Sequence, residues 1–137
     1  MIRAILVEDN DEFRQCVKQI LSSRYPSIQL MEAGDGLEAM SKIDLLPPDL
    51  IFMDIQLPDK NGLELTRMIK ARYPKVIVVI LSNYDLTEYR QTAYQNGASY
   101  YISKDSPIGD FFSLIERIIG NQVSQRSSLH YNNSISN

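Results

Sequence analysis

The chain of 137 residues has room for one domain with a single full-sized hydrophobic core. Its 44% hydrophobic and 23% charged residues are typical of globular proteins. The net charge of −3 gives no electrostatic footprint for nucleic acid, so any DNA binding is expected to need another domain. Cys16, the only cysteine, excludes an internal disulfide and fits a reducing cytoplasm, and the single histidine, His130, excludes a histidine-rich metal site.

Short apolar runs alternate with amphipathic segments along the chain. Strands are predicted at residues 2–7, 27–33, 49–53, 75–81 and 99–103, where β-branched and other apolar residues cluster. Helices are predicted between them from apolar residues at helical spacing, the first beginning near Phe13. Asp35 and Asp85 each precede a glutamate by three residues, which predicts a capped helix start. The last helix is expected to end near Gly120.

The order of these elements is (βα)5. Strict alternation with short connections predicts an α/β fold, with a parallel sheet, right-handed crossovers and helices on both faces. A barrel needs ~250 residues, so we expect an open, doubly wound, five-stranded sheet of the flavodoxin-like type, with strand order 2-1-3-4-5. This domain should span residues 1–120, and residues 121–137 should form a polar tail or interdomain linker. Because no apolar run is long enough to cross a membrane, we expect a cytoplasmic protein.

Polar residues stand at the carboxyl ends of four predicted strands. The first strand leads into Glu8 and Asp9, the third into Asp54, the fourth into Ser82 and the fifth into Lys104. In an open parallel sheet these strand ends meet in one crevice, where ligands bind. Each residue alone is explained by a helix cap, a turn or a surface position. Together, three acids, a hydroxyl and an amine at these ends predict a functional site.

These residues lie in segments that resemble the response-regulator receiver domain of two-component signalling. The matching segments are ILVEDN at 5–10, DLIFMDIQLPDKNGLEL at 49–65, VVILSN at 78–83 and NGASYYISKD at 96–105. The resemblance implies a domain that takes a phosphoryl group from a sensor histidine kinase or a phosphotransfer protein. It implies control of an output domain or partner, with transcription regulation as the expected output. Lys104 followed by Asp105 resembles the branch whose output is a LuxR-type helix-turn-helix, and leaves open whether their peptide bond is cis.

The resemblance assigns Asp54 as the phosphoacceptor. Lys104 is implied to neutralise charge on the phosphoryl oxygens, and Ser82 to donate a hydrogen bond to one of them. Tyr101, three residues before Lys104, is implied to be the switch aromatic, whose ring turns inward when Ser82 moves toward the phosphoryl group. The output surface would be the face of the fourth helix, fifth strand and fifth helix, through which a homodimer could also form.

A divalent cation is implied by the clustered acids, because neighbouring carboxylates repel one another unless a cation neutralises them. Mg2+ suits such an oxygen-rich site, and Mn2+ is an acceptable substitute. The resemblance places Asp9, Asp54 and the backbone carbonyl of Gln56 as direct ligands, with Glu8 acting through a bound water. Gln56 and Tyr84 also occupy positions that influence phosphoryl lifetime in this family, and their size predicts slow self-dephosphorylation.

Other functions share parts of this pattern. A phosphatase that forms an aspartyl phosphate generally needs an acid two residues after its nucleophile, where this chain has Gln56. We therefore expect a signalling domain that assists only its own phosphorylation and dephosphorylation, not an enzyme acting on other substrates. A phosphorylation-independent protein-interaction domain on the same fold is the alternative, although all five strand-end residues are present. A nucleotide-binding module is disfavoured because the chain has neither a GxGxxG nor a P-loop pattern.

Overall fold

Strands and helices alternate along the chain, as the sequence predicts. The computed structural model describes the backbone of residues 1–136 and the side chains of residues 1–122. The elements are β1 (Ile2–Val7), α1 (Asp11–Arg24), β2 (Ile28–Ala33), α2 (Gly36–Leu45), β3 (Leu50–Asp54), α3 (Gly62–Arg72), β4 (Ile77–Ser82), α4 (Thr87–Gln95), β5 (Tyr100–Ser103) and α5 (Ile108–Ser136). The chain divides into two compact units, Met1–Lys104 with the whole sheet, and the remainder with α5.

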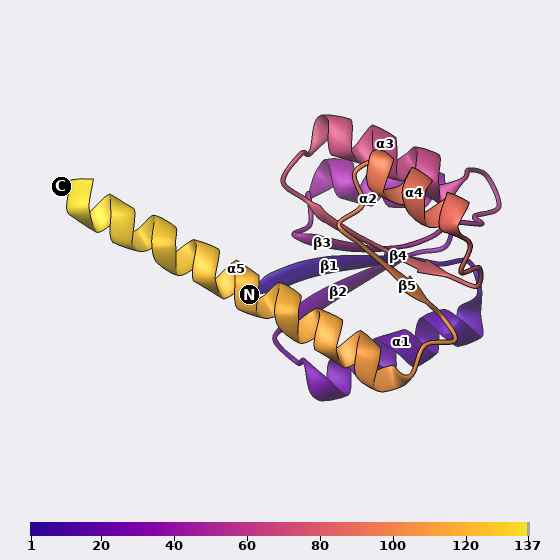
Figure 1. The fold of residues 1–137 in the computed structure, drawn as a ribbon, viewed down its shortest axis with the longest axis horizontal. Helices are drawn as coiled ribbons and strands as arrows, with labels where there is room; N and C mark the ends of the chain where they lie inside the picture. The colour runs from indigo at the N-terminus through magenta and orange to yellow at the C-terminus, as the bar shows by residue number, and fades with distance from the viewer. Residues whose placement is uncertain (137) are drawn as a thin grey trace. The chain divides into compact units, whose positions relative to one another are not determined.

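All strands are parallel and follow the order β2-β1-β3-β4-β5, which confirms the predicted flavodoxin-like topology. Within the first unit, α2, α3 and α4 cover one face of the sheet and α1 lies on the other (Figure 1). The chain reverses its direction of winding between β1 and β3, which are neighbours in the sheet. Ligands of such sheets bind at this switch point, beyond the carboxyl ends of the strands.

The sheet is held by apolar side chains that alternate between its two faces. Every residue of β3 is buried, as expected of a central strand that is covered on both sides. Ile5 and Met53 belong to the cluster under α2, α3 and α4, where Leu65 and Ile69 of α3 also lie. The buried residues of α1, Val17 and Leu21, serve the opposite face. The strand ends that carry the polar residues are therefore anchored in a closely packed core.

Helix ends show where local sequence decides the structure. The Asp35 carboxylate accepts a hydrogen bond from the backbone N–H of Glu38 at 2.7 Å and caps α2, as predicted. The cap predicted at Asp85 is wrong. Residue Leu86 occupies the N-cap of α4, and the Asp85 carboxylate instead pairs with Arg90 at 2.6 Å. The guanidinium thus takes the oxygen that would otherwise cap the helix.

The end of the last helix also departs from the prediction, because α5 continues past Gly120 to Ser136. One glycine inside a helix costs about 1 kcal/mol, which neighbouring turns can offset. A glycine stops a helix when it takes a positive φ, as Gly97 does after α4 at φ 104°. Among the described glycines only Gly97 does so. The assignment of residues 121–137 as a tail or linker stays a prediction.

Two smaller findings concern the chain as a whole. No cis peptide bond occurs in the described part of the chain, the bond after Lys104 included. Within the same residues, no helix combines the length and the hydropathy that a membrane span requires.

Candidate functional site

The parallel register brings the predicted polar residues to one edge of the sheet. Val7 pairs with Met53, so Glu8 and Asp9 follow β1 beside Asp54, the last residue of β3. One carboxylate oxygen from each of these three acids lies within 4.8 Å of the others. Glu8 and Asp54 are buried, with 1% and 8% of their surface exposed. Asp9 is exposed, so the acidic cluster opens to solvent on its side.

Lys104 closes the buried side of this cluster. Its N–H donates to the backbone carbonyl of Ser82 at 2.7 Å, which fixes the turn after β5 beside β4. Its ammonium group forms a short hydrogen bond with the Glu8 carboxylate and lies 3.6 Å from Oδ1 of Asp54. Only 9% of the Lys104 side chain is exposed. A single buried cation thus faces two buried carboxylates.

The charge balance of the cluster is visible in the pKa of Asp54. Burial first of all, and then a hydrogen bond with Glu8 and the negative charge of Glu8, raise this pKa from 3.8 to about 7. The ammonium group of Lys104 and the backbone N–H of Gln56 lower it, without restoring the ordinary value. The site therefore carries more negative charge than its own lysine neutralises.

The loop after β3 is built around a close backbone contact. The N–H of Gly62 donates to the carbonyl of Ile55 at 2.6 Å, and a Cβ on Gly62 would lie 1.9 Å from the backbone oxygen of Asp54. Glycine is required here because α3 begins directly against the backbone at the end of β3. The Asp59 carboxylate ties the same loop to α2 by accepting the N–H of Gly36 at 2.8 Å. The predicted ligand role of the Gln56 carbonyl stays a prediction.

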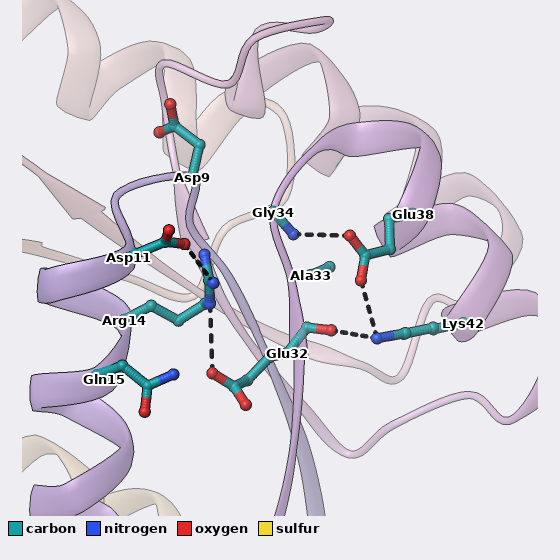
Figure 2. Close-up of a pocket in the computed structure, with 9 residues that line it drawn as sticks. All are labelled: Asp9, Asp11, Arg14, Gln15, Glu32, Ala33, Gly34, Glu38 and Lys42. Atoms are coloured by element: carbon teal, nitrogen blue, oxygen red, sulfur yellow. Dashed lines mark hydrogen bonds and ion pairs between the residues drawn. The ribbon is translucent and has the colours of Figure 1, made fainter.

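Arg14 of α1 braces the other side of the site, along a pocket of about 380 Å³ (Figure 2). Its Nη1 donates to the backbone carbonyl of Glu8 at 2.7 Å. The same guanidinium contacts Asp11 at 2.5 Å and Glu32 at 3.3 Å, so all sides of its fork are engaged. Figure 2 shows Asp9 turned away from this network, at the rim of the pocket. Arg14 thus holds the turn that presents Glu8 and Asp9.

Ser82 and Tyr101 are joined through the backbone of one residue, Tyr84. Ser82 is fully buried, and its Oγ accepts the N–H of Tyr84 at 2.9 Å. The hydroxyl of Tyr101 donates to the carbonyl of Tyr84 at 2.5 Å. Tyr101 is buried and Tyr100 half-buried, as strand alternation predicts. Arg90 lies over the Tyr101 ring at 4.7 Å and covers it from the α4 side.

Sequence reasoning missed three residues around this site. Phe13 faces the ammonium group of Lys104 at 4.4 Å from the ring centroid, although its place in an apolar helical stripe indicated only packing. Arg14 and Arg90 carry no motif, and their contacts lie between three and eighteen residues away in the sequence, so no single spacing indicates them. The available signal was residue type, because the planar fork of arginine can hold several fixed acceptors at once.

Comparisons with known proteins match most of the chain. The family model described as response regulator receiver domain matches residues 4–116. The transcriptional regulatory protein DegU of Brevibacillus brevis is 36% identical over 118 residues, which cover 85% of this chain and 48% of that protein. The activator DevR/DosR of Mycobacterium tuberculosis is 35% identical over 106 residues, which cover 77% of this chain and 48% of that protein. The chain spans about half the length of these curated relatives.

Solved structures share the fold over most of the chain. A two-component response regulator of the LuxR family from an Aurantimonas species has a TM-score of 0.81 and 28% identity, covering 88% of this chain and 86% of that chain. A CheY-like receiver domain protein from Methanospirillum hungatei has a TM-score of 0.82 and 25% identity, covering 91% of this chain and 98% of that chain.

Proposed function

The chain belongs to the receiver domains of two-component response regulators, and from that premise we propose that Asp54 accepts a phosphoryl group. The donor would be a phosphohistidine of a sensor histidine kinase or a phosphotransfer protein. One observation carries the proposal: the buried Asp54 carboxylate lies within 4.8 Å of two further acids and 3.6 Å from a buried lysine. Such an arrangement places the ammonium group, and a cation held by the acids, beside one nucleophilic oxygen, where their positive charge can stabilise the transferred phosphoryl group.

The acidic cluster fits a small divalent cation. Oxygen ligands from three carboxylates converge, and the raised pKa of Asp54 reflects negative charge that the lysine leaves uncompensated. Asp9 and Asp54 would hold Mg2+ directly with the carbonyl of Gln56, and Glu8 would contribute through a water, with Mn2+ as a substitute. When bound, the cation supplies positive charge that neutralises the acids and the incoming phosphoryl oxygens.

The protein groups have separate tasks in the transfer. The ionised Asp54 carboxylate attacks phosphorus in line, an O–P bond forms, and the P–N bond to the donor imidazole breaks with its electron pair leaving on nitrogen. That nitrogen is then protonated as the neutral imidazole departs. Lys104 offers its ammonium group to the phosphoryl oxygens next to Asp54, and the Ser82 hydroxyl donates to another of them. The product is an acyl phosphate on Asp54.

The switch would run through Tyr84. The Ser82 hydroxyl accepts the N–H of Tyr84, and the Tyr101 hydroxyl donates to the carbonyl of Tyr84. A shift of Ser82 toward the phosphoryl group would therefore move the backbone to which Tyr101 is hydrogen-bonded. The surface that responds includes α4 and β5, where Tyr94 and Leu86 are each 48% exposed. A role for α5 in this surface and a homodimer formed through it stay predictions. The two-state logic requires only that the phosphoryl group favour one arrangement.

The output is proposed to be transcriptional. DegU and DevR/DosR are named as regulators of transcription, and they are about twice as long as the matched segment. A protein-glutamate methylesterase/protein-glutamine glutaminase of a Nocardioides species is 34% identical over 122 residues, so a similar segment also occurs in a protein named as an enzyme. We propose that this chain is itself no enzyme for other substrates and that it acts in the cytoplasm, where a free, exposed Cys16 stays reduced.

Intact-mass analysis tests the central proposal. The protein is treated with acetyl phosphate and Mg2+, and one added phosphoryl group is expected on the unaltered chain and none on Asp54→Asn. Equal labelling of both proteins would defeat the assignment of Asp54. Absence of any label on the unaltered chain would favour the alternative, a phosphorylation-independent interaction domain.

A further inference from the structure

The ammonium group of Lys104 has an aromatic neighbour. Its Nζ lies 4.4 Å from the centroid of the Phe13 ring, which is the geometry of a cation–π contact. Phe13 is the third residue of α1, and its backbone N–H donates to the capping side chain of Asn10 at 3.0 Å. The ring is therefore placed by the same turn that presents Asp9.

Lys104 needs such support because its long, flexible side chain has a competing partner. The ammonium group makes its shorter contact with the Glu8 carboxylate. It lies 3.6 Å from Oδ1 of Asp54, on the carboxylate that would receive the phosphoryl group. A carboxylate that pairs with the lysine consumes the charge which the phosphoryl oxygens require. An aromatic face attracts the ammonium group without neutralising it, and the attraction grows where water is excluded. With 9% of the Lys104 side chain exposed, little water surrounds it.

We infer that Phe13 is a positioning residue for phosphoryl transfer, holding the Lys104 ammonium group beside Asp54 through its ring face. The inference rests on the proposed function of Asp54 and Lys104. Phe13 touches no reacting atom, and it acts only through the lysine. The ring keeps the ammonium group beside Asp54 even when Glu8 no longer pairs with it. The lysine is therefore already in place when the phosphoryl group arrives.

Phe13 could instead contribute only packing to α1, and the two roles differ in what a substitution changes. Phe13→Leu keeps an apolar side chain of similar bulk and removes the ring, whereas Phe13→Tyr keeps the ring. Tyr25→Leu is a matched control, because Tyr25 is an aromatic residue at the opposite end of the same helix. If Phe13 only packs, its substitutions should change the stability of the fold. If Phe13 positions Lys104, they should change the phosphorylation rate only while Lys104 is present.

The test is a double-mutant cycle read by the rate of phosphorylation with acetyl phosphate at saturating Mg2+. Phe13→Leu should slow labelling by about three- to tenfold, the range expected for losing a partly desolvated cation–π contact. Phe13→Tyr should retain the rate, and Tyr25→Leu should match the unaltered chain. In a Lys104→Met background, Phe13→Leu should cause no further slowing. Equal slowing in both backgrounds, or no slowing in either, would overturn the inference.

A series of progressively fluorinated phenylalanines at position 13 keeps the test independent of folding defects. Fluorine weakens the negative ring face with little change in shape, so the labelling rate should fall stepwise along the series. A flat series would overturn the inference while leaving Asp54 and Lys104 in their roles. If the unaltered chain takes no label at all, the proposed function itself fails, which is a different result.

Discussion

Replacing Asp54 by asparagine should stabilise the metal-free protein at neutral pH. Folding raises the pKa of this carboxyl from 3.8 to about 7, mainly through burial and then through Glu8. At roughly 1.4 kcal/mol per pH unit, ionising it costs the folded state about 4 kcal/mol. The folded state holds the proton more tightly, so this cost is absent below pH ~4, grows as the pH rises toward 7, and stays constant above.

Urea unfolding in EDTA at several pH values measures the effect. We expect Asp54→Asn to exceed the unaltered chain by about 2–4 kcal/mol at pH ~7.5 and to match it at pH ~4. Asp59→Asn is a control with the opposite expected sign. The N–H of Gly36 is the chief cause that lowers the pKa of Asp59, so Asp59→Asn should destabilise the protein at neutral pH. If Asp54→Asn is no more stable than the unaltered chain at pH ~7.5, the argument from buried charge is refuted.

Three further predictions concern residues around the site. Arg14→Lys keeps the charge but loses the planar fork, so Mg2+ affinity by calorimetry should fall roughly three- to tenfold, and an unchanged affinity would contradict the bracing role. Gly62→Ala should destabilise the fold by roughly 3 kcal/mol or more in urea, because its methyl meets backbone at 1.9 Å, whereas Gly109→Ala, with open space, should not. The Gln56 side chain lies 3.4 Å from the Tyr84 hydroxyl, so replacing both by alanine should speed acyl-phosphate loss by about tenfold. An acyl-phosphate lifetime of seconds in the unaltered chain would contradict the shielding on which this last expectation depends.

The sheet was predictable because its signals are local. Apolar runs of strand length and their alternation with helical segments lead to the observed order of all five strands. The predicted ends shift by a residue or two where side chains intervene. Asp49, placed at the start of the third strand, instead accepts the N–H of Arg3 with its carboxylate at 2.9 Å, and the strand begins at Leu50. The error at Asp85 has the same origin, because its partner Arg90 could not be known from spacing alone.

The meeting of the acids and the lysine at one edge was predictable from topology, whereas the side chains that support them were not. Parallel strands end at one edge, so Glu8, Asp54 and Lys104 had to meet there once the order was known. The contacts of Phe13 and Arg14 depend on how side chains lie between α1 and the strand ends. From residue type alone, Phe13 belongs to an apolar stripe and Arg14 is a surface arginine. Only the fold shows that Phe13 faces the ammonium group of Lys104 and that Arg14 donates to the backbone carbonyl of Glu8.

The raised pKa of Asp54 makes a proton and a divalent cation competitors for the same carboxylate oxygens. In the metal-free site a proton on Asp54 relieves its repulsion from the Glu8 carboxylate. A divalent cation relieves the same repulsion, so its binding near neutral pH must release that proton, and its affinity must rise with pH up to about 7. Ionised Asp54 is also the form that would attack phosphorus in the proposed transfer. A bound cation would therefore favour the carboxylate form of Asp54 before any donor arrives, and we expect Lys104, 4.4 Å from the centroid of the Phe13 ring, to keep its charge available for the phosphoryl oxygens.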